Sequence, residues 1–539
     1  MNTNRLIESR CRLQVAKMEP FSGHLRVASE RLAGGTGSKG TDISVAFIIN
    51  RTADECEAIR PHHALDCGII LDGKVANLVQ IELIDLVLVF ASRHACWKLV
   101  SVSRGGWNRD FASKDITLEV RSMKLSRRSL LATTAGSLPF VLSRRTPAAS
   151  QANPTLEDLD RAASAPLLKL DGIRNPVIIK SMELLRNEKE ILVRVRSKDG
   201  VEGVIVTNSW WLADTYPIFL NRVASFLVGK DARRIETLLE DLLQPQLNYK
   251  LQGLALWVCV AAAEMAVLEM LGRICNKSIG ELFGGVRRRD IAVYRASGRR
   301  GNRPEEEIKY LRELVAETGA SAVKFRVGGQ LGNISDSHPG RSEALIPMVR
   351  EAFGDDMTIY ADSNSSYDVS NAIRIGRMME EYNYAFFEEP CRFDDLWETK
   401  QVADALKIPI AGGEQEFSMR RFRWTILNRA VDVVQPDLHY YGGYIRATRV
   451  ARMAAAAGLQ CTPHMSGWGL GYLNALHFMS YIPNAASHME FKGHSDIPLS
   501  CNSSSLKCEK GVIRVPDGPG FGIDIDPDYV NKATRITVI

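Results

Sequence analysis

Three short apolar runs between residues 357 and 416 each end in acid, and this pattern limits the possible folds more than any other in the chain. The runs are MTIYAD, YAFFEE and IPIAGGE, and they place Asp362, Glu388 and Glu414 at or just past their ends. Successive acids are 26 residues apart, which is about one strand, one helix and two loops. Carboxylates on successive parallel strands of a barrel converge at its C-terminal mouth, where a hard divalent cation can bind.

The alternation of apolar runs and amphipathic stretches extends on both sides of these acids. Apolar runs begin at residues 290, 321, 357, 384, 408, 431, 459 and 486, and stretches such as PEEEIKYLRELVAETG separate them. Eight strands with intervening helices in about 200 residues predict a (β/α)-type barrel over 290–492.

Three later runs also end in groups that are suited to catalysis. They place Asp437, His464 and Glu490 at spacings of 23, 27 and 26 residues from the preceding group. The alternative is that these are charges of surface loops. Six in a row at the period of a barrel argue against it, because a buried charge is costly unless it is paired or metal-bound.

Two cations lie on the second predicted strand. Lys324 and Arg326 are two residues apart, so their side chains point the same way and need an anionic partner. A metal-bound carboxylate substrate would provide one. The alternative is an ion pair with Glu388, Glu389 or Asp362 that has no catalytic part.

Before the barrel, residues 170–289 predict an α+β domain. Two strands, an Asp-Gly turn and a third strand precede helical stretches, of which LALWVCVAAAEMAVLEMLGRICN is apolar nearly all round and should be buried. The segments 186–190 and 208–216 are candidate lid loops. Trp210 and Trp211 in the second would cover a ligand, or else pack on a domain interface.

The composition excludes few classes of protein. A chain of 539 residues exceeds one typical domain, and a net charge of +5 is too weak to indicate nucleic-acid binding. The apolar run 76–92 carries two acids and is too short to span a membrane. Residues 1–122 show no persistent period and are assigned no fold.

Residues 123–152 have the layout of a secretory signal. MKLSRRSLL is followed by the apolar stretch LLATTAGSLPFVL and the small residues TPAASQA, and the paired arginines resemble a twin-arginine export signal. A signal is read at an N-terminus, so this interpretation requires translation to start at Met123 and predicts a periplasmic protein. The alternative is a basic linker in a cytoplasmic protein.

Motifs along residues 175–539 resemble those of the enolase superfamily, and specifically its mandelate racemase subgroup. They occur in the order KSIGELFGG, KFR, DSN, EEP, GGEQ, QPD, PH and ME. The resemblance implies an α/β protein with an N-terminal α+β capping domain and a modified (β/α)7β TIM-type barrel. It also implies that residues 493–539 return to the cap, and that the protein is a homo-oligomer.

The resemblance also implies roles for individual residues. Asp362, Glu388 and Glu414 would be ligands of Mg²⁺, and Asn364 would contact the substrate or a metal-bound water. Asp437 and His464 would form a catalytic dyad, and Glu490 would hydrogen-bond an oxygen of the substrate carboxylate.

One departure from the family bears on the reaction. Many relatives carry a second lysine as a base where this chain has Arg326, and guanidinium is a poor base. His464 is then the principal base, which favours dehydration of a sugar acid over racemisation, with acid help from His464 or Lys324. A racemase, epimerase or cycloisomerase remains the alternative enzyme. A metal-dependent acid-sugar binding protein without catalysis is the alternative of another class.

Overall fold

The computed structural model describes residues 154–466 and 469–537, and eight strands within residues 9–124. The chain divides into two compact units, residues 1–146 and 147–539. The first unit holds two antiparallel sheets, with strand orders β1-β8-β7-β6 and β2-β3-β4-β5. Its strands are β1 (Ser9–Leu13), β2 (Glu30–Arg31), β3 (Ser44–Ile49), β4 (Leu65–Leu71), β5 (Lys74–Ile81), β6 (Leu86–Ala91), β7 (Trp97–Val102) and β8 (Ile116–Lys124).

Of the segment 123–152, which was predicted to be an export signal, residues 123 and 124 end β8 and the rest lie outside the described residues. Export and a translation start at Met123 therefore stay predictions.

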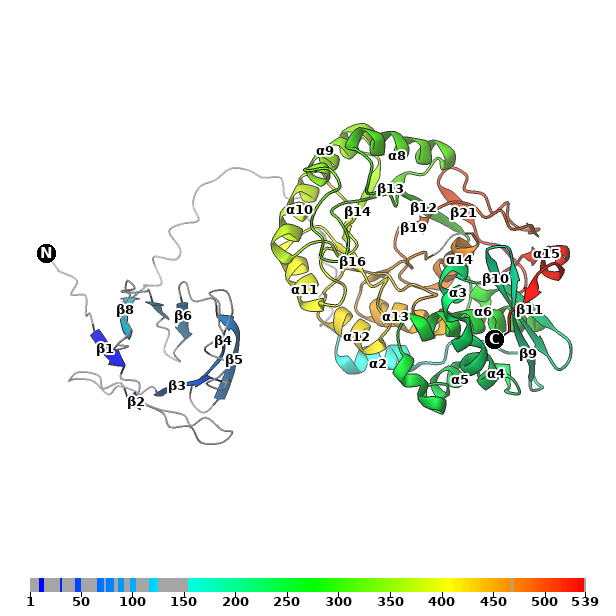
Figure 1. Cartoon of the computed structure of the whole chain (residues 1–539), viewed down its shortest axis with the longest axis horizontal. Helices are drawn as coiled ribbons and strands as arrows, with labels where there is room; N and C mark the ends of the chain where they lie inside the picture. Colours follow the sequence, from blue (N-terminus) through cyan, green and yellow to red (C-terminus); the bar gives the residue numbers. More distant parts are fainter. Residues whose placement is uncertain are drawn as a thin grey trace. The chain divides into compact units, whose positions relative to one another are not determined.

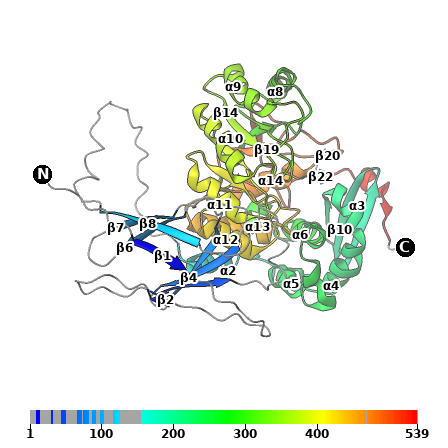
Figure 2. The same cartoon turned by 60° about the vertical axis from the view of Figure 1, so that its left-hand side comes forward.

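A four-stranded sheet forms the centre of the cap. β9 (Ile179–Asn187), β10 (Glu190–Ser197) and β11 (Glu202–Val206) are antiparallel neighbours, and the Asp199-Gly200 turn joins the last two. The C-terminal strand β23 (Thr534–Arg535) pairs with β9 and completes the sheet. The C-terminal segment therefore lies beside the cap strands, as Figures 1 and 2 both show.

Several short helices and one long helix follow the first three strands of this sheet, and the long helix packs against β10 and β11. The helices are α3 (Ser209–Ile218), a π-helical turn (Phe219–Ala224), α4 (Ser225–Leu227), two 3-10 helices (Ala232–Arg234 and Pro245–Leu251), α5 (Ile235–Asp241), α6 (Leu254–Cys275) and α7 (Ile279–Leu282). Helix α6 contacts β10, β11, α3 and the barrel helix α13. Being enclosed on all sides, it needs no polar face, and the predicted burial of this helix is confirmed.

By length and composition alone, α6 is the one helix in the described part of the chain that could cross a membrane. Its most apolar window is 89% buried inside the fold, as in a core helix.

The predicted barrel is confirmed. Parallel pairing runs in the order β12-β13-β14-β15-β16-β17-β18, with β19 on the other side of β12, and a bridge from Cys461 to Ala485 links the two ends. Helices α8–α12 line the outside of the ring in Figure 1. Eight strands and seven intervening helices make the fold (β/α)7β. The strands are β12 (Asp290–Ala296), β13 (Ala322–Arg326), β14 (Thr358–Asp362), β15 (Phe386–Glu388), β16 (Ile410–Gly412), β17 (Val433–Val434), β18 (Gln460–Cys461) and β19 (Met489–Phe491).

The barrel strands are buried on both faces, which is why they read as continuous apolar runs in the sequence. The intervening helices are α8 (Pro304–Thr318), α9 (Arg341–Phe353), α10 (Val369–Glu381), α11 (Leu396–Ala405), α12 (Met419–Leu427), α13 (Tyr444–Ala456) and α14 (Gly471–Tyr481). Six of the intervening helices are buried in part, whereas every residue of α14 from Tyr472 to Tyr481 is buried.

Segments from both ends of the second unit cover the barrel. Helix α2 (Leu156–Ser164) packs on α13 and α12, where Asp160 pairs with Arg423 at 2.7 Å. After the barrel come β20 (Leu499–Ser500), β21 (Val512–Arg514), β22 (Asp524–Ile525) and α15 (Pro527–Asn531), with β21 paired to β12.

A buried carboxylate joins the cap to the barrel. Glu264 on α6 accepts the backbone N–H groups of Tyr444 and Ile445 at 2.6 and 2.8 Å, so it caps the first turn of α13. Gly443 precedes that turn with φ of 103°, and a Cβ there would lie 1.5 Å from the Glu264 carboxylate. Only glycine therefore allows the approach.

The buried position of Glu264 should make stability depend on pH. Burial raises the pKa of its carboxyl to about 8, despite the two backbone N–H groups that favour the ionised form. Because the folded pKa exceeds the unfolded one, this group costs stability progressively as pH rises from about 4.5 to about 8. We expect the wild type to lose roughly 3–5 kcal/mol relative to Glu264→Gln across that window.

Urea unfolding of both proteins at pH 5, 6, 7, 8 and 9 measures this difference, and subtraction removes the titration of all other groups. A difference in unfolding free energy that does not change between pH 5 and 8 would contradict the expectation.

Candidate functional site

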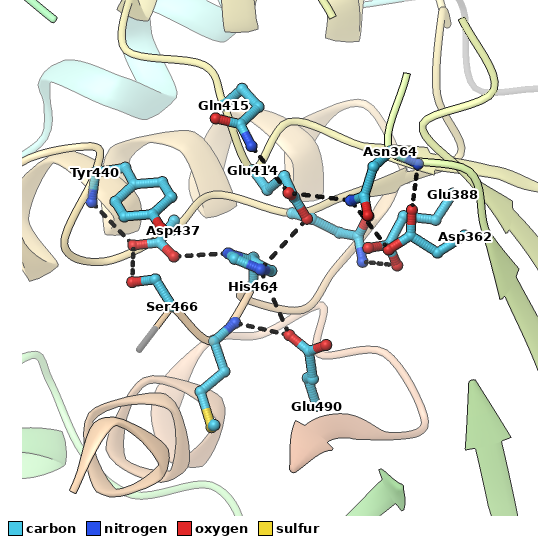
Figure 3. A network of polar contacts seen from close by, with 12 residues as sticks. Asp362, Asn364, Glu388, Glu414, Gln415, Asp437, Tyr440, His464, Ser466 and Glu490 are labelled. Carbon is cyan, nitrogen blue, oxygen red and sulfur yellow. Dashed lines mark hydrogen bonds and ion pairs between the residues drawn. The ribbon is translucent and has the colours of Figure 1, made fainter. Parts of the chain in front are cut away.

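Three buried carboxylates meet at the C-terminal mouth of the barrel. Asp362 is the last residue of β14, Glu388 the last of β15, and Glu414 follows β16 by two residues. Each offers an oxygen that lies within 4.8 Å of the others, and Figure 3 shows the three side chains turned toward one another. Parallel strands in register bring them together, since Asp362 is opposite Glu388 in the β14–β15 pair.

The cations of β13 face the same carboxylates. Lys324 Nζ donates to both oxygens of Glu388 at 2.7 and 2.8 Å and lies 3.5 Å from Asp362 Oδ2. Arg326 forms an ion pair with Asp362. Burial would lower the pKa of Lys324, but Glu388 and Glu490 outweigh it and raise that pKa above its usual value. Both cations therefore pair with carboxylates of the site, and their part in catalysis stays a prediction.

The donor set fits a hard divalent cation. All three carboxylates are almost fully buried, and among the described residues Glu414 Oε2 receives no hydrogen bond. Such an oxygen is costly to bury unless a cation neutralises it. Carboxylate oxygens without sulfur or histidine ligands are what Mg²⁺ prefers.

Asn364 lies between two of these carboxylates and is oriented by an arginine. Its side-chain nitrogen is 3.4 Å from Asp362 Oδ2 and 3.5 Å from Glu414 Oε1. Its Oδ1 accepts a hydrogen bond from Arg300 at 2.6 Å. The amide therefore presents a donor toward the metal site, which suits contact with an anionic substrate.

The backbone around the carboxylates is strained. Asn364, Ser365 and Glu389 have φ of 44°, 64° and 42°, a region that side chains other than glycine rarely occupy. Ser365 N–H donates to the Glu389 carbonyl oxygen at 2.8 Å, which holds the two loops together. Strain of this kind persists where the surroundings fix it, as they do at functional sites.

Asp437 and His464 form a buried dyad. His464 Nδ1 lies 2.7 Å from Asp437 Oδ2, and Asp437 Oδ1 accepts the backbone N–H groups of His439 and Tyr440 at 2.7 and 2.9 Å. The carboxylate thus holds the imidazole with its proton on Nδ1, and Nε2 is left as the basic nitrogen.

The basic nitrogen of His464 faces the metal site. Nε2 lies 3.3 Å from Glu414 Oε2 and 3.7 Å from Glu490 Oε2 (Figure 3). Burial alone would lower the pKa of His464, but Glu414, Asp437 and Glu490 outweigh it and raise the pKa above its usual value. For Asp437 burial would raise the pKa, yet the imidazole and the backbone donors lower it.

Glu490 is the middle residue of β19 and lies between cations. Its Oε1 is 3.3 Å from Lys324 Nζ, and its Oε2 accepts the Met465 N–H at 3.0 Å. Burial would raise the pKa of its carboxyl, but Lys324, Lys492 and His464 hold that pKa well below its usual range. An ionised carboxylate cannot donate a hydrogen bond. The hydrogen bond predicted from Glu490 to a substrate carboxylate therefore requires a protonated Glu490, which these cations disfavour.

The segment 208–216 is a helix and not the predicted loop. Asn208 caps α3 by accepting the Trp211 N–H at 3.4 Å, so both tryptophans lie in its first turn. Trp210 is 73% exposed. Trp211 Nε1 donates to the Tyr440 hydroxyl at 3.0 Å, and the Tyr440 ring is 6.0 Å from the His464 ring. Tyr440 thus links Trp211 to the dyad, whereas the role predicted for Trp210 gains no support from its position.

Sequence reasoning missed several groups that surround the predicted residues. Gln435 donates to Glu388 Oε2 at 3.0 Å, and Ser466 links Asp437 Oδ1 to Asn208 of the cap through two contacts of 3.0 Å. Gln435 precedes Asp437 by two residues, so strand alternation could have found it. No local pattern marks Arg300 or Ser466.

Comparison with known proteins agrees with this fold. Residues 170–284 match the model of the mandelate racemase/muconate lactonizing enzyme N-terminal domain, and residues 306–529 match that of the enolase C-terminal domain-like family. D-galactarolactone cycloisomerase of Agrobacterium fabrum is 31% identical over 64% of this chain and 90% of its own. Arabinonate dehydratase of Saccharolobus solfataricus is 25% identical over 62% of this chain and 88% of its own.

Among solved structures, the mandelate racemase/muconate lactonizing protein of Paracoccus denitrificans PD1222, complexed with magnesium, has a TM-score of 0.60 and 26% identity. The match covers 67% of this chain and all of that one. The fold, both domain matches and these relatives together show that the chain belongs to the enolase superfamily, in its mandelate racemase subgroup.

Proposed function

We propose that this protein is a Mg²⁺-dependent dehydratase of a sugar acid, an aldonate or aldarate, that forms a 2-keto-3-deoxy product. The observation that carries the proposal is the position of His464 Nε2, held by Asp437 and placed 3.3 Å from a carboxylate of the metal site. A base beside such a site suits removal of a proton α to a carboxylate. The name of the arabinonate dehydratase relative supports the substrate class.

Asp362, Glu388 and Glu414 would hold the ion. Bound Mg²⁺ would supply a Lewis acid that stabilises the second negative charge developing on the substrate carboxylate. The Asn364 amide nitrogen, which faces Asp362 and Glu414, would donate to the same anionic group. Groups fixed in advance where charge develops contribute the largest share of such catalysis.

The dyad carries out the first proton transfer. His464 Nε2 takes the α-proton, and the Asp437 carboxylate stabilises the imidazolium through Nδ1–H. The enediolate that forms then expels the β-hydroxyl, and the resulting enol becomes the 2-keto acid. Racemisation needs a base on the opposite face, where Lys324 is hydrogen-bonded to both oxygens of Glu388.

A cycloisomerase is the second candidate, and the 31% identity to D-galactarolactone cycloisomerase favours it. Both reactions begin with removal of an α-proton. Incubation with sugar acids and with their lactones separates the two, because a dehydratase forms 2-keto acid from the open acid.

Metal binding should depend on Glu414. We expect Mg²⁺ at about 100 times its Kd to raise the free energy of unfolding of the wild type by about 2.7 kcal/mol. Glu414→Gln removes a ligand charge and should lose most of that increase. Thermal unfolding with and without Mg²⁺ measures it.

Glu416→Gln is the matched control, because Glu416 bonds to Arg421 and to the backbone of Phe417 and Ser418, away from the three carboxylates. The metal assignment fails if Glu414→Gln and Glu416→Gln respond to Mg²⁺ equally.

Replacement of the proposed base should abolish turnover. His464→Asn is expected to lower both 2-keto acid formation and exchange of the α-hydrogen with D₂O by at least about 100-fold. His488→Asn serves as the control. His488 directly precedes β19, and its ring bonds to the Tyr360 hydroxyl and not to the dyad. Full activity of His464→Asn on a panel of D-arabinonate, D-galactonate and galactarate would rule out the mechanism.

A further inference from the structure

The proposed dehydration needs a group that protonates the leaving oxygen. Hydroxide leaves a β-carbon poorly, so an acid must donate a proton as the C–O bond breaks. His464 serves as the base for the α-proton. A separate donor near the β-carbon would let each group perform one transfer.

Neither cation of β13 is suited to this task. Lys324 is fully buried and directs its ammonium to both oxygens of Glu388, with Glu490 at 3.3 Å. Arg326 is ion-paired with Asp362, and guanidinium gives up a proton too reluctantly to act as an acid.

Lys492 lies on the other side of the site, beside the dyad. It follows β19 and is two residues past Glu490, so the two side chains point to the same side of the chain. Its Nζ donates to the Met465 carbonyl and lies 3.6 Å from Glu490 Oε2. The side chain is 18% exposed, so it can meet a ligand in the mouth while its stem is packed.

One carboxylate oxygen relates Lys492 to the base. Glu490 Oε2 is 3.6 Å from Lys492 Nζ and 3.7 Å from His464 Nε2. The ammonium and the imidazole therefore flank the same oxygen. In a substrate the α- and β-carbons are directly bonded. For a syn elimination, the base at the α-carbon and the acid at the β-carbon must therefore lie close together on the same face of the substrate.

We propose that Lys492 is the catalytic acid of this site and protonates the departing β-hydroxyl. The inference rests on the proposed dehydratase function. In the step, the enediolate electron pair forms the Cα=Cβ bond, the Cβ–O bond breaks, and one N–H of Lys492 transfers its proton to the oxygen, which leaves as water. The neutral amine then regains a proton from solvent. The His464 imidazolium releases the α-proton to solvent.

The competing arrangement uses His464 twice. The imidazolium formed in the first step would return its proton to the β-hydroxyl, and Lys492 would only neutralise Glu490. A substrate whose leaving group needs no proton separates the two arrangements, because fluoride leaves as the anion.

The experiment compares wild type, Lys492→Met and Lys492→Arg as full-length proteins with Mg²⁺. The substrate is whichever of D-arabinonate, D-galactonate and galactarate the wild type dehydrates, together with its 3-deoxy-3-fluoro analogue. Keto-acid formation, fluoride release and α-hydrogen exchange in D₂O are measured. Calorimetry with the non-reactive 3-deoxy acid reports binding without turnover.

We expect Lys492→Met to lower dehydration by about 100-fold or more, and to keep fluoride release and α-hydrogen exchange within about tenfold of wild type. Lys492→Arg keeps the charge and should bind the 3-deoxy acid within about threefold of wild type, yet should not restore dehydration. This combination would support the acid role, because a structural role for Lys492 would lower all the rates together.

Three results would overturn the inference. They are dehydration near the wild-type rate in Lys492→Met, a parallel loss of fluoride release and dehydration, and restoration of dehydration in Lys492→Arg. A wild type that exchanges the α-hydrogen of these acids but dehydrates none of them would instead refute the proposed function.

Discussion

Burial of negative charge in one end of a barrel is the constraint on which the rest of this structure depends. Five carboxylates are almost fully removed from solvent. They are those of Asp362, Glu388, Glu414, Asp437 and Glu490. Their mutual repulsion is offset by Lys324 and Arg326 on one side and by His464 and Lys492 on the other. A divalent cation would complete the balance at the oxygen of Glu414 that the described side chains leave without a hydrogen bond.

The cap holds in place the loop that carries Asp437. Asp437 lies between β17 and α13, and the cap reaches the same loop at two points. Trp211 bonds to Tyr440, and Glu264 caps the first turn of α13. Asn208 adds a third link through Ser466 to Asp437. The orientation of the His464 imidazole therefore depends on a domain that supplies neither His464 nor the three carboxylates of the candidate metal site.

The sequence predicted the barrel and its strand ends because they follow from local rules. Buried parallel strands are apolar runs, the period of a βα unit is nearly constant, and the charge at each strand end stands out against the apolar run before it. These rules locate Asp362, Glu388, Glu414, Asp437 and His464. Most of the observed strands are shorter than the apolar runs, although β12 extends one residue beyond its run.

Other features of the site depend on contacts distant in sequence, which no local rule predicts. The segment 208–216 was expected to be a loop, but Asn208 caps a helix there and only one of its two tryptophans reaches the site. The roles of Lys324 and Lys492 depend on which carboxylate each faces. Lys492 was not predicted, because Glu490 had already been taken as the ionisable group of that strand. Arg300 orients Asn364 from 64 residues away.

A crystal structure with Mg²⁺ and a hydroxamate that mimics the enediolate of a sugar acid would test the account most directly. We expect the ion within about 2.1 Å of one oxygen each of Asp362, Glu388 and Glu414. We also expect the carbon that corresponds to the α-position to lie against His464 Nε2, and the β-hydroxyl to lie within hydrogen-bond distance of Lys492 Nζ. An ion bound elsewhere, or a ligand whose α-carbon faces away from His464, would contradict it.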